Sequence, residues 1–321
     1  MPSSACVKYR FAKGGRAVAN KMRAESPLIH QWNKNWFYII TLAPAVLFIL
    51  SFFLIILVKL VIFSFTHYSG GKESGATIQN YIDVFSSEDF YEAYLRTLVF
   101  VLIVTPAQLV TGFITASLIN KGFRGRGVIR GILVSPLTLP SLVTASIFYI
   151  LFSKGGHINS MLLGQYEFFP KVMSKPISFV GDPTGSYVLT TIVKIWRDTP
   201  ASMLILLSGM QSLDFAQDEA AMTMGATKIQ RIFYITVPAL IPSIASVLTL
   251  RSIEAWKEFV FPYFLSPSYP LLSVLVDEFY NVQRNPGLAA VVGVVLIVSI
   301  MVFNFILKFL LKLVNRYLVK V

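Results

Sequence analysis

The chain is poor in charge. Asp, Glu, Lys and Arg make up 14% of its 321 residues, whereas 55% are hydrophobic. Soluble domains carry about 25% charged residues, and a soluble protein of this size could not cover its surface with so few. The excess apolar surface needs a solvent other than water, and lipid is the natural one. This composition excludes an ordinary soluble domain and indicates a membrane protein.

Residue types that commonly carry chemistry are also scarce. Cys6 is the only cysteine, which excludes an intrachain disulfide and a cysteine-based metal site, and the three histidines are too scattered for metal-ligand spacing. No G-x-x-x-x-G-K-[ST] phosphate loop is present, so we expect no ATP binding by this chain. G-x-S-x-G, H-E-x-x-H and C-x-x-C motifs are absent as well. We therefore nominate no catalytic residue and expect neither a cofactor nor a metal here.

Six stretches are long and apolar enough to cross a bilayer, which takes about 20 residues per helix. They lie at about 37–65, 92–119, 128–153, 187–211, 238–264 and 287–314. The first is too long for the core of a signal peptide, roughly 7–15 residues, so we expect a retained span. Prolines inside the second to fifth stretches predict bent helices. The expected fold class is an all-α integral membrane protein with six transmembrane helices.

Basic residues gather on one side of these predicted spans. The N-terminal segment, the segments after the second and fourth spans, and the C-terminal end hold 17 of the 28 Lys and Arg residues, while the alternate loops hold four. Because Lys- and Arg-rich loops stay in the cytoplasm, both termini are predicted to be cytoplasmic. The asymmetry also accounts for the net charge of +12 without nucleic acid. The predicted organisation is a basic cytoplasmic segment 1–36, a six-span domain 37–315 and a cytoplasmic tail 316–321.

The segment 212–237, between the fourth and fifth spans, carries the most informative pattern. Asp214 can cap a short helix that runs through Ala221 and ends near Gly225, a residue suited to the left-handed conformation that ends many helices. The small alanines of this helix would let another protein surface approach closely. A second short segment, Lys228–Thr236, then leads into the fifth span. By these features alone, an ordinary interhelical loop fits equally well.

A glutamate, two alanines and a glycine stand at fixed spacing in this segment, with Asp218 before Glu219, Ala220, Ala221 and Gly225, and with Ala226 and Pro238 after them. The pattern resembles the "EAA" loop of the permease subunits of bacterial binding-protein-dependent ABC importers. The preceding stretch 196–213 resembles their carbohydrate branch, typified by maltose-type permeases. The resemblance covers roughly residues 90–315.

The resemblance implies that Glu219 to Gly225 form a coupling helix docked in a groove of a cytoplasmic ATPase subunit. It also implies a second permease subunit, two ATP-binding cassette ATPase subunits that bind ATP and Mg, and an external (periplasmic) solute-binding protein. The chain would work by alternating access in the bacterial inner membrane, as a multi-pass ABC importer type I permease. One position departs from the family: Met224 stands where Asp is common.

Charged residues lie inside the fourth and fifth predicted spans, where each charge that faced lipid would cost about 2.5–3.5 kcal/mol. They must therefore face a bundle interior or a water-filled cavity. Helical spacing places the polar residues of the fourth span on one face and those of the fifth in one stripe. This candidate translocation pathway consists of Thr190, Lys194, Trp196, Arg197, Asp198, Arg251, Glu254 and Glu258.

Two interpretations of these charges stay open. In the first they pair into a structural network, for example Lys194 or Arg197 with Asp198, and Glu254 with Arg251 three residues before it. In the second they line a pathway, where Lys194 and Arg197 would suit an anionic or richly hydroxylated solute, such as an acidic oligosaccharide containing uronates. Trp196 and Trp256 could stack on sugar rings, but tryptophans also anchor proteins at the membrane interface.

Three functions compete at this point. The first is a carbohydrate importer permease, which accounts for segment 212–237. The second is an ion-coupled secondary transporter of a polar solute, whose intramembrane charges would form an ion site. The third is a membrane enzyme, which would need Asp198, Glu254 and Glu258 to converge in space.

Overall fold

The structure is a computed structural model that describes residues 27–69, 72–213 and 215–318. Most of the predicted basic segment 1–36 lies outside the described residues, as does the predicted helix cap Asp214. The chain divides into two units, residues 1–59 and residues 60–321.

Helix α2 (Pro27–Ser64) is apolar from Tyr38 to Ser64, and this part matches the first predicted span. None of its most apolar stretch is buried within the chain, and Leu47 and Phe48 are largely exposed. A helix that is hydrophobic on all sides needs lipid or a protein partner to cover it.

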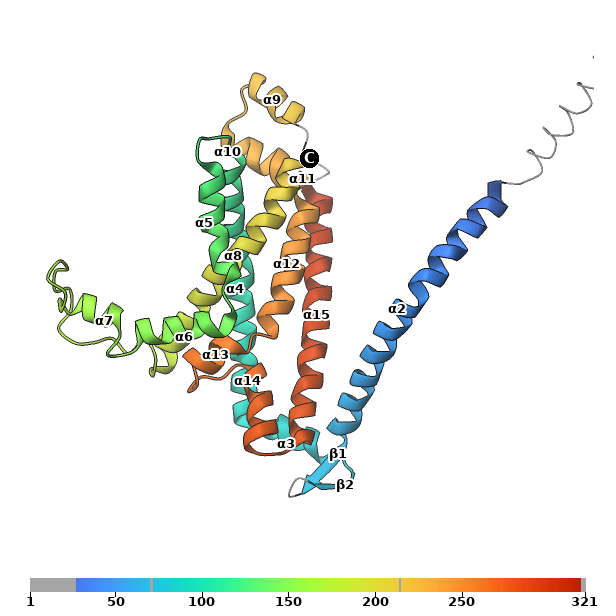
Figure 1. Cartoon of the computed structure of the whole chain (residues 1–321), viewed down its shortest axis with the longest axis vertical. Coiled ribbons are helices and arrows are strands. Elements are labelled where there is room, and N and C mark those ends of the chain that lie inside the picture. The colour runs from blue at the N-terminus through green and yellow to red at the C-terminus, as the bar shows by residue number, and fades with distance from the viewer. Residues whose placement is uncertain (1–26, 70–71, 214, 319–321) are drawn as a thin grey trace, which may run out of the picture. The chain divides into compact units, whose positions relative to one another are not determined.

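A small hairpin and a short helix follow α2. Strands β1 (Thr66–Ser69) and β2 (Lys72–Ala76) pair antiparallel, with Thr66 opposite Ala76, and helix α3 (Gln79–Ser86) comes next. The buried Asn80 amide donates to the carbonyl oxygens of Ser64 (3.1 Å) and Thr66 (2.8 Å), which ties α3 to the hairpin. This cap lies at the end of the bundle opposite α9 (Figure 1).

Four long helices form the bundle: α4 (Glu88–Asn120), α8 (Pro183–Gln211), α12 (Ile241–Trp256) and α15 (Pro286–Leu318). Helix α4 packs along α8, and α12 packs against α4, α8 and α15. Gly112 of α4 lets the first pair approach closely, because a Cβ there would lie 2.8 Å from the Cβ of Ser202. Small residues at such contacts are typical of membrane helix pairs.

Two of the predicted spans are broken helices. Helices α5 (Arg126–Thr138) and α6 (Ser141–Phe152) meet at 93°, with Pro140 at the start of α6, and α7 (His157–Leu162) follows. Proline restricts the residue before it and cannot continue the hydrogen-bond ladder, so the helix stops there. Helix α6 then packs on α13 (Val260–Leu265).

The second break lies in the fifth predicted span. Helix α9 (Phe215–Thr223) is followed by α10 (Lys228–Arg231), the π-helical turn η1 (Ile232–Thr236) and α11 (Val237–Ala239). The helical stretch Lys228–Ala239 then bends by 70° into α12. Beyond α13 come α14 (Leu272–Asp277) and the π-helical turn η2 (Glu278–Val282), which lead into α15.

Within the described residues, three helices are long and apolar enough to cross a membrane, and five spans result if each bent pair counts as one. The three are α4, α15 and the Tyr38–Ser64 part of α2. The remaining predicted span corresponds to α8, which has 29 residues but carries Lys194, Arg197 and Asp198 in its middle. The structure is thus a helical membrane bundle, in which α8 carries three charged residues in its middle and α12 carries Arg251 and Glu254.

Candidate functional site

Helix α9 stands out from the end of the bundle and presents the residues of the predicted coupling motif (Figure 1). Glu219 and Ala220 are exposed, and Ala221 is half-buried. The helix ends where Gly225 takes a left-handed φ of +85° and the amide of Ala226 donates to the carbonyl of Ala221 (3.0 Å). The predicted glycine-ended helix is therefore present.

Met224, just before this glycine, is 88% exposed. Nothing lies within 4 Å of a Cβ built on Gly225. The tip of α9 is therefore open to any partner that approaches it.

The segment after α9 is also well defined. Thr227 caps α10 by a reciprocal pair: its Oγ1 accepts from the amide of Gln230 (3.4 Å), and the Gln230 side chain accepts from the amide of Thr227 (2.8 Å). Such a capping box satisfies amides that a helix start leaves open. Pro238 then lies in α11, before the bend into α12.

An ion pair joins the two halves of this loop. Arg231 Nη1 on α10 lies 2.6 Å from Asp218 Oδ2 on α9. The sequence did not predict this pair, because thirteen positions separate the two residues and no helical periodicity relates them. It makes α9 and α10 one connected unit.

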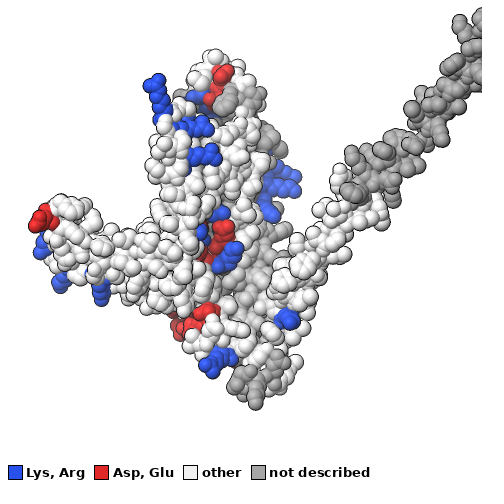
Figure 2. Space-filling model, in the orientation of Figure 1, with Lys and Arg blue, Asp and Glu red and all other residues white. Residues whose placement is uncertain are grey.

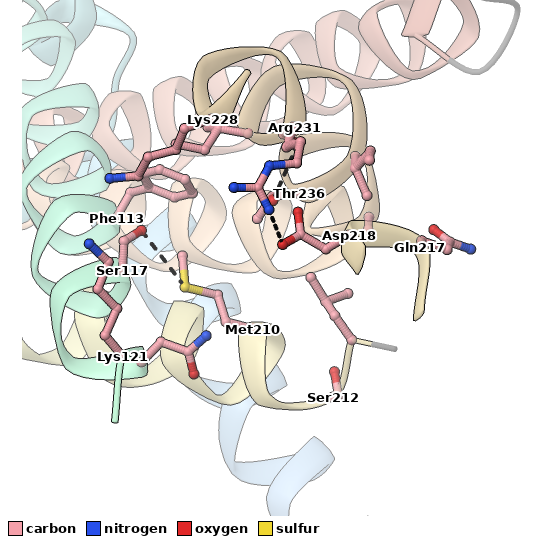
Figure 3. Close-up of a pocket in the computed structure, with 15 residues that line it drawn as sticks. Phe113, Ser117, Lys121, Met210, Ser212, Gln217, Asp218, Lys228, Arg231 and Thr236 are labelled. Atoms are coloured by element: carbon pink, nitrogen blue, oxygen red, sulfur yellow. Dashed lines mark hydrogen bonds and ion pairs between the residues drawn. The ribbon is translucent and has the colours of Figure 1, made fainter. Parts of the chain in front are cut away.

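A cavity of about 420 Å³ lies between this unit and the ends of α4 and α8 (Figure 3). The Arg231–Asp218 pair forms part of its wall, together with Phe113 and Ser117 of α4 and Met210 of α8. No sequence motif predicted this cavity, since it requires three segments distant along the chain.

The charges inside the bundle form a paired network. Lys194 Nζ lies 2.7 Å from Asp198 Oδ2 and also contacts the Glu258 carboxylate, while Arg197 Nη1 lies 2.6 Å from Asp198 Oδ1. Lys194, Asp198 and Glu258 are buried. One group of charged side chains appears at mid-height of the bundle, and others lie towards its two ends (Figure 2). The pairing that the sequence suggested as one alternative is thus present.

The sequence predicts that Arg251, Glu254 and Glu258 form one stripe on the fifth span, and this prediction is wrong for Glu258. Arg251 pairs with Glu254 (2.8 Å), as expected for residues three apart, and lies 4.0 Å from Asp198. However, α12 ends at Trp256, and Glu258 lies in the break before α13. There Glu258 Oε1 accepts from the amide of Phe261 (3.2 Å), so its carboxylate satisfies the start of α13 as well as Lys194. No sequence period predicts such a break.

The network carries no net charge, because three cations face three carboxylates. The basic face predicted from Lys194 and Arg197 is therefore balanced by residues of α8 itself and of the fifth span. Thr190 is buried beside this network on α8.

Trp196 and Trp256, the two tryptophans considered for stacking on sugar rings, differ in their exposure. Trp196 is 43% exposed and packs against Phe148, with 5.4 Å between the ring centroids, whereas Trp256 is 1% exposed in a cluster with Tyr94 and Phe303. Trp256 is therefore a core residue in this conformation, and a sugar could not stack on it. Trp196 keeps an open face.

Among the described residues, no group of three or more His, Cys, Asp or Glu side chains is arranged so that it could bind a metal ion.

A bundle of apolar helices with a paired charge network inside and a motif-bearing helix at one end belongs to the class of membrane permease subunits. Residues 108–319 match the family described as binding-protein-dependent transport system inner membrane component, and the chain belongs to this family.

Relatives with assigned names support this membership. The trehalose/maltose transport system permease protein MalF of Thermococcus litoralis is 25% identical over 71% of this chain and 77% of that protein. The sulfoquinovosyl glycerol transport system permease protein SmoG of Agrobacterium fabrum is 28% identical over 77% of this chain and 79% of that protein.

The fold has a solved counterpart in a chain of a bacterial alginate ABC transporter, crystallised in complex with an alginate pentasaccharide-bound periplasmic protein. The alignment covers 89% of this chain and 97% of that one, with a TM-score of 0.74 and 19% identity. At this identity the likeness shows a common fold.

Proposed function

We propose that this importer permease moves a carbohydrate across the bacterial cytoplasmic membrane as one of two pore-forming subunits. The names of the relatives support a sugar solute, since both transport glycosides. The observation that carries the proposal is helix α9, a glycine-ended helix with the Glu219-Ala220-Ala221 motif at the end of a membrane bundle.

Helix α9 is proposed to dock in a groove of a cytoplasmic ATPase subunit. It is short, it is joined to α10 by Arg231 and Asp218, and α10 leads through α11 into α12. A movement of the ATPase would therefore reach the bundle as displacement of a connected unit. Two ATPase subunits would bind ATP and Mg, a second permease would complete the pore, and a periplasmic binding protein would deliver the solute.

We propose that α8, which corresponds to the fourth predicted span, also crosses the membrane, which brings the number of spans to six. We also propose that both ends of the chain lie in the cytoplasm. The length of α8, 29 residues, exceeds what the bilayer requires, about 20. Lys194 and Asp198 are buried, Arg197 is half-buried, and all three are paired within the protein, which removes most of the cost of placing them at mid-membrane. The excess of Lys and Arg in segment 1–36, in the segments after the second and fourth predicted spans and at the C-terminal end supports this cytoplasmic orientation.

The charge network is proposed to border the translocation pathway. Because its charges balance, it provides hydrogen-bonding groups without a net field. We therefore propose a hydroxyl-rich oligosaccharide as the solute class, with uronate-containing sugars as a narrower case within it.

Two measurements test this function. Affinity purification of the full chain from native membranes should recover an ATP-binding cassette ATPase and a second permease. Deletion of the chain should abolish ATP-dependent uptake of labelled oligosaccharides, with neutral and uronate-containing sugars assayed separately. Uptake that instead collapses with the proton gradient while ATP is present would favour an ion-coupled transporter and contradict the proposal.

A further inference from the structure

The cavity beside α9 has an unusual combination of linings. Its volume is about 420 Å³, and residues of α4, α8 and the α9–α11 segment surround it. Phe113, Met210 and Ile235 contribute apolar surface, whereas Lys121 and Lys228 contribute ammonium groups. A cavity that is apolar on one side and cationic on another suits a ligand with an apolar part and a negatively charged group.

The cavity has an excess of positive charge. Among the described residues that line it, Asp218 is the one carboxylate, and it pairs with Arg231. Neither Lys121 nor Lys228 forms an ion pair with another described residue. Figure 3 shows both lysine side chains extending to one side of the cavity, away from the Arg231–Asp218 pair. Two positive charges are thus available to a ligand.

Arg231 adds a second, independent observation. Its Nε is buried and has no hydrogen-bond partner among the described residues, although Nη1 pairs with Asp218. The guanidinium therefore keeps hydrogen-bonding capacity beyond its pair with Asp218, and its positive charge attracts an anion in the cavity. Guanidinium groups present several donors in one plane and bind phosphate oxygens well.

We propose that this cavity binds a phosphate-bearing anion, with the phosphate held by Lys121 and Lys228 and with Arg231 adding positive charge to the cavity wall. Such a phosphate can belong to the headgroup of an anionic phospholipid, whose apolar part would lie against Phe113 and Met210, or to a small soluble phosphate. Basic pockets between helices at the cytoplasmic membrane surface are suited to anionic headgroups. The lipid case rests on the proposed cytoplasmic orientation of α9.

Occupation of this cavity would affect coupling. Its wall includes Asp218 and Arg231, which join α9 to α10, while its other walls belong to α4 and α8. A ligand held between them would brace the α9–α10 unit against the bundle. The ligand would thus regulate how far a displacement of α9 reaches the membrane helices.

The test measures lipid retained by the purified full chain. The full chain is placed in nanodiscs that contain phosphatidylglycerol or only phosphatidylcholine, extracted, and analysed by native mass spectrometry. The Lys121→Gln/Lys228→Gln variant is compared with Arg124→Gln/Arg130→Gln, which removes two charges from exposed positions outside the cavity. Each cavity lysine should contribute roughly fivefold in affinity, so the first variant should bind phosphatidylglycerol about 25-fold more weakly. The control variant should retain most of the binding.

The second arm distinguishes the sources of phosphate. Inorganic phosphate is titrated into the phosphatidylcholine nanodiscs, and binding is followed by nuclear magnetic resonance of phosphorus. Saturable phosphate binding that the cavity variant loses, with no preference for phosphatidylglycerol, would assign the site to a soluble ligand. Equal binding of both probes by the cavity variant and the control variant would overturn the proposal. Recovery of an ATPase with the chain is scored separately, so that the failure of this site and the failure of the importer function remain distinguishable.

Discussion

The buried charges show how single residues make a polar helix compatible with lipid. Lys194 connects two carboxylates, one on its own helix and one at the break after α12. A charge left without its partner in such a setting is far more costly than the neutral pair. The stability of the bundle therefore depends on the whole set of pairs.

Replacing Lys194 with methionine should destabilise the protein by about 3–5 kcal/mol, because the Glu258 carboxylate loses its charged partner. The double variant Lys194→Met/Glu258→Gln should recover part of this loss. Thermal unfolding of the purified full chain in one detergent measures both. Lys257→Met is the matched control, since Lys257 is exposed. Equal unfolding temperatures for the Lys194→Met and Lys257→Met variants would refute the structural role of the network.

Gly225 offers a second test at the scale of one residue. Its φ of +85° is costly for β-branched residues but accessible to asparagine, and no atom lies within 4 Å of a Cβ at this position. Gly225→Val should therefore shift the end of α9, at a cost of about 1–2 kcal/mol, and uncouple ATP hydrolysis from transport, while Gly225→Asn should keep most transport.

The readout is the ratio of solute transported to ATP hydrolysed by the assembled complex. Full coupling in the Gly225→Val variant would show that the conformation of this glycine is unimportant. Loss of coupling in both variants would place the partner surface against Gly225 itself.

Residues with a local pattern were the predictable ones. The end of α9 followed from Gly225, and the Arg251–Glu254 pair followed from helical spacing. The Asp218–Arg231 and Lys194–Glu258 pairs did not, because they join segments whose approach depends on tertiary packing. The placement of Trp256 in the core likewise depended on neighbours that no local pattern reveals.

At the scale of elements, the contact between α4 and α8 holds the bundle together. Gly112 lies at a close contact between the two helices, with Met203 N 3.1 Å from a Cβ built there. Backbone atoms cannot move aside as a flexible side chain can, so an added methyl group must separate the helices.

Gly112→Ala should therefore lower stability by about 1–3 kcal/mol. Gly131→Ala on α5 is the matched control: a Cβ there has no atom within 4 Å, and alanine favours a helix by up to about 1 kcal/mol over glycine. Thermal unfolding in detergent should rank the control at or above the original chain and Gly112→Ala below it. The reverse order would contradict the observed helix packing.

Hydrophobic length predicted where helices occur but could not predict where they break. All six apolar stretches contain helix, yet the third and fifth bend by 93° and 70°. Prolines flank both of these bends, with Pro140 before α6 and Pro238 and Pro242 on either side of the bend into α12. A further break, between α12 and α13, contains no proline, and the side chain of Glu258 instead satisfies the amide of Phe261 there.

At the scale of the whole molecule, the chain exposes more apolar surface than one subunit can cover. Only 22% of the most apolar stretch of α15 is buried, and α9 presents Met224 openly. Lipid and a second subunit would cover the first of these surfaces, and an ATPase subunit would cover the second. The proposed importer thus requires partners at both its membrane face and its α9 end.

The most direct test of the central claim uses the single native cysteine. With Cys6 replaced by serine, Met224→Cys places one thiol at the tip of α9, which a benzophenone maleimide can label and then cross-link with light. We predict that an impermeant maleimide does not label this thiol in intact cells, and that cross-linking in open membranes yields an adduct with an ATP-binding cassette ATPase. Labelling of Met224→Cys from outside the cell, or the absence of an ATPase adduct in the assembled complex, would contradict the account.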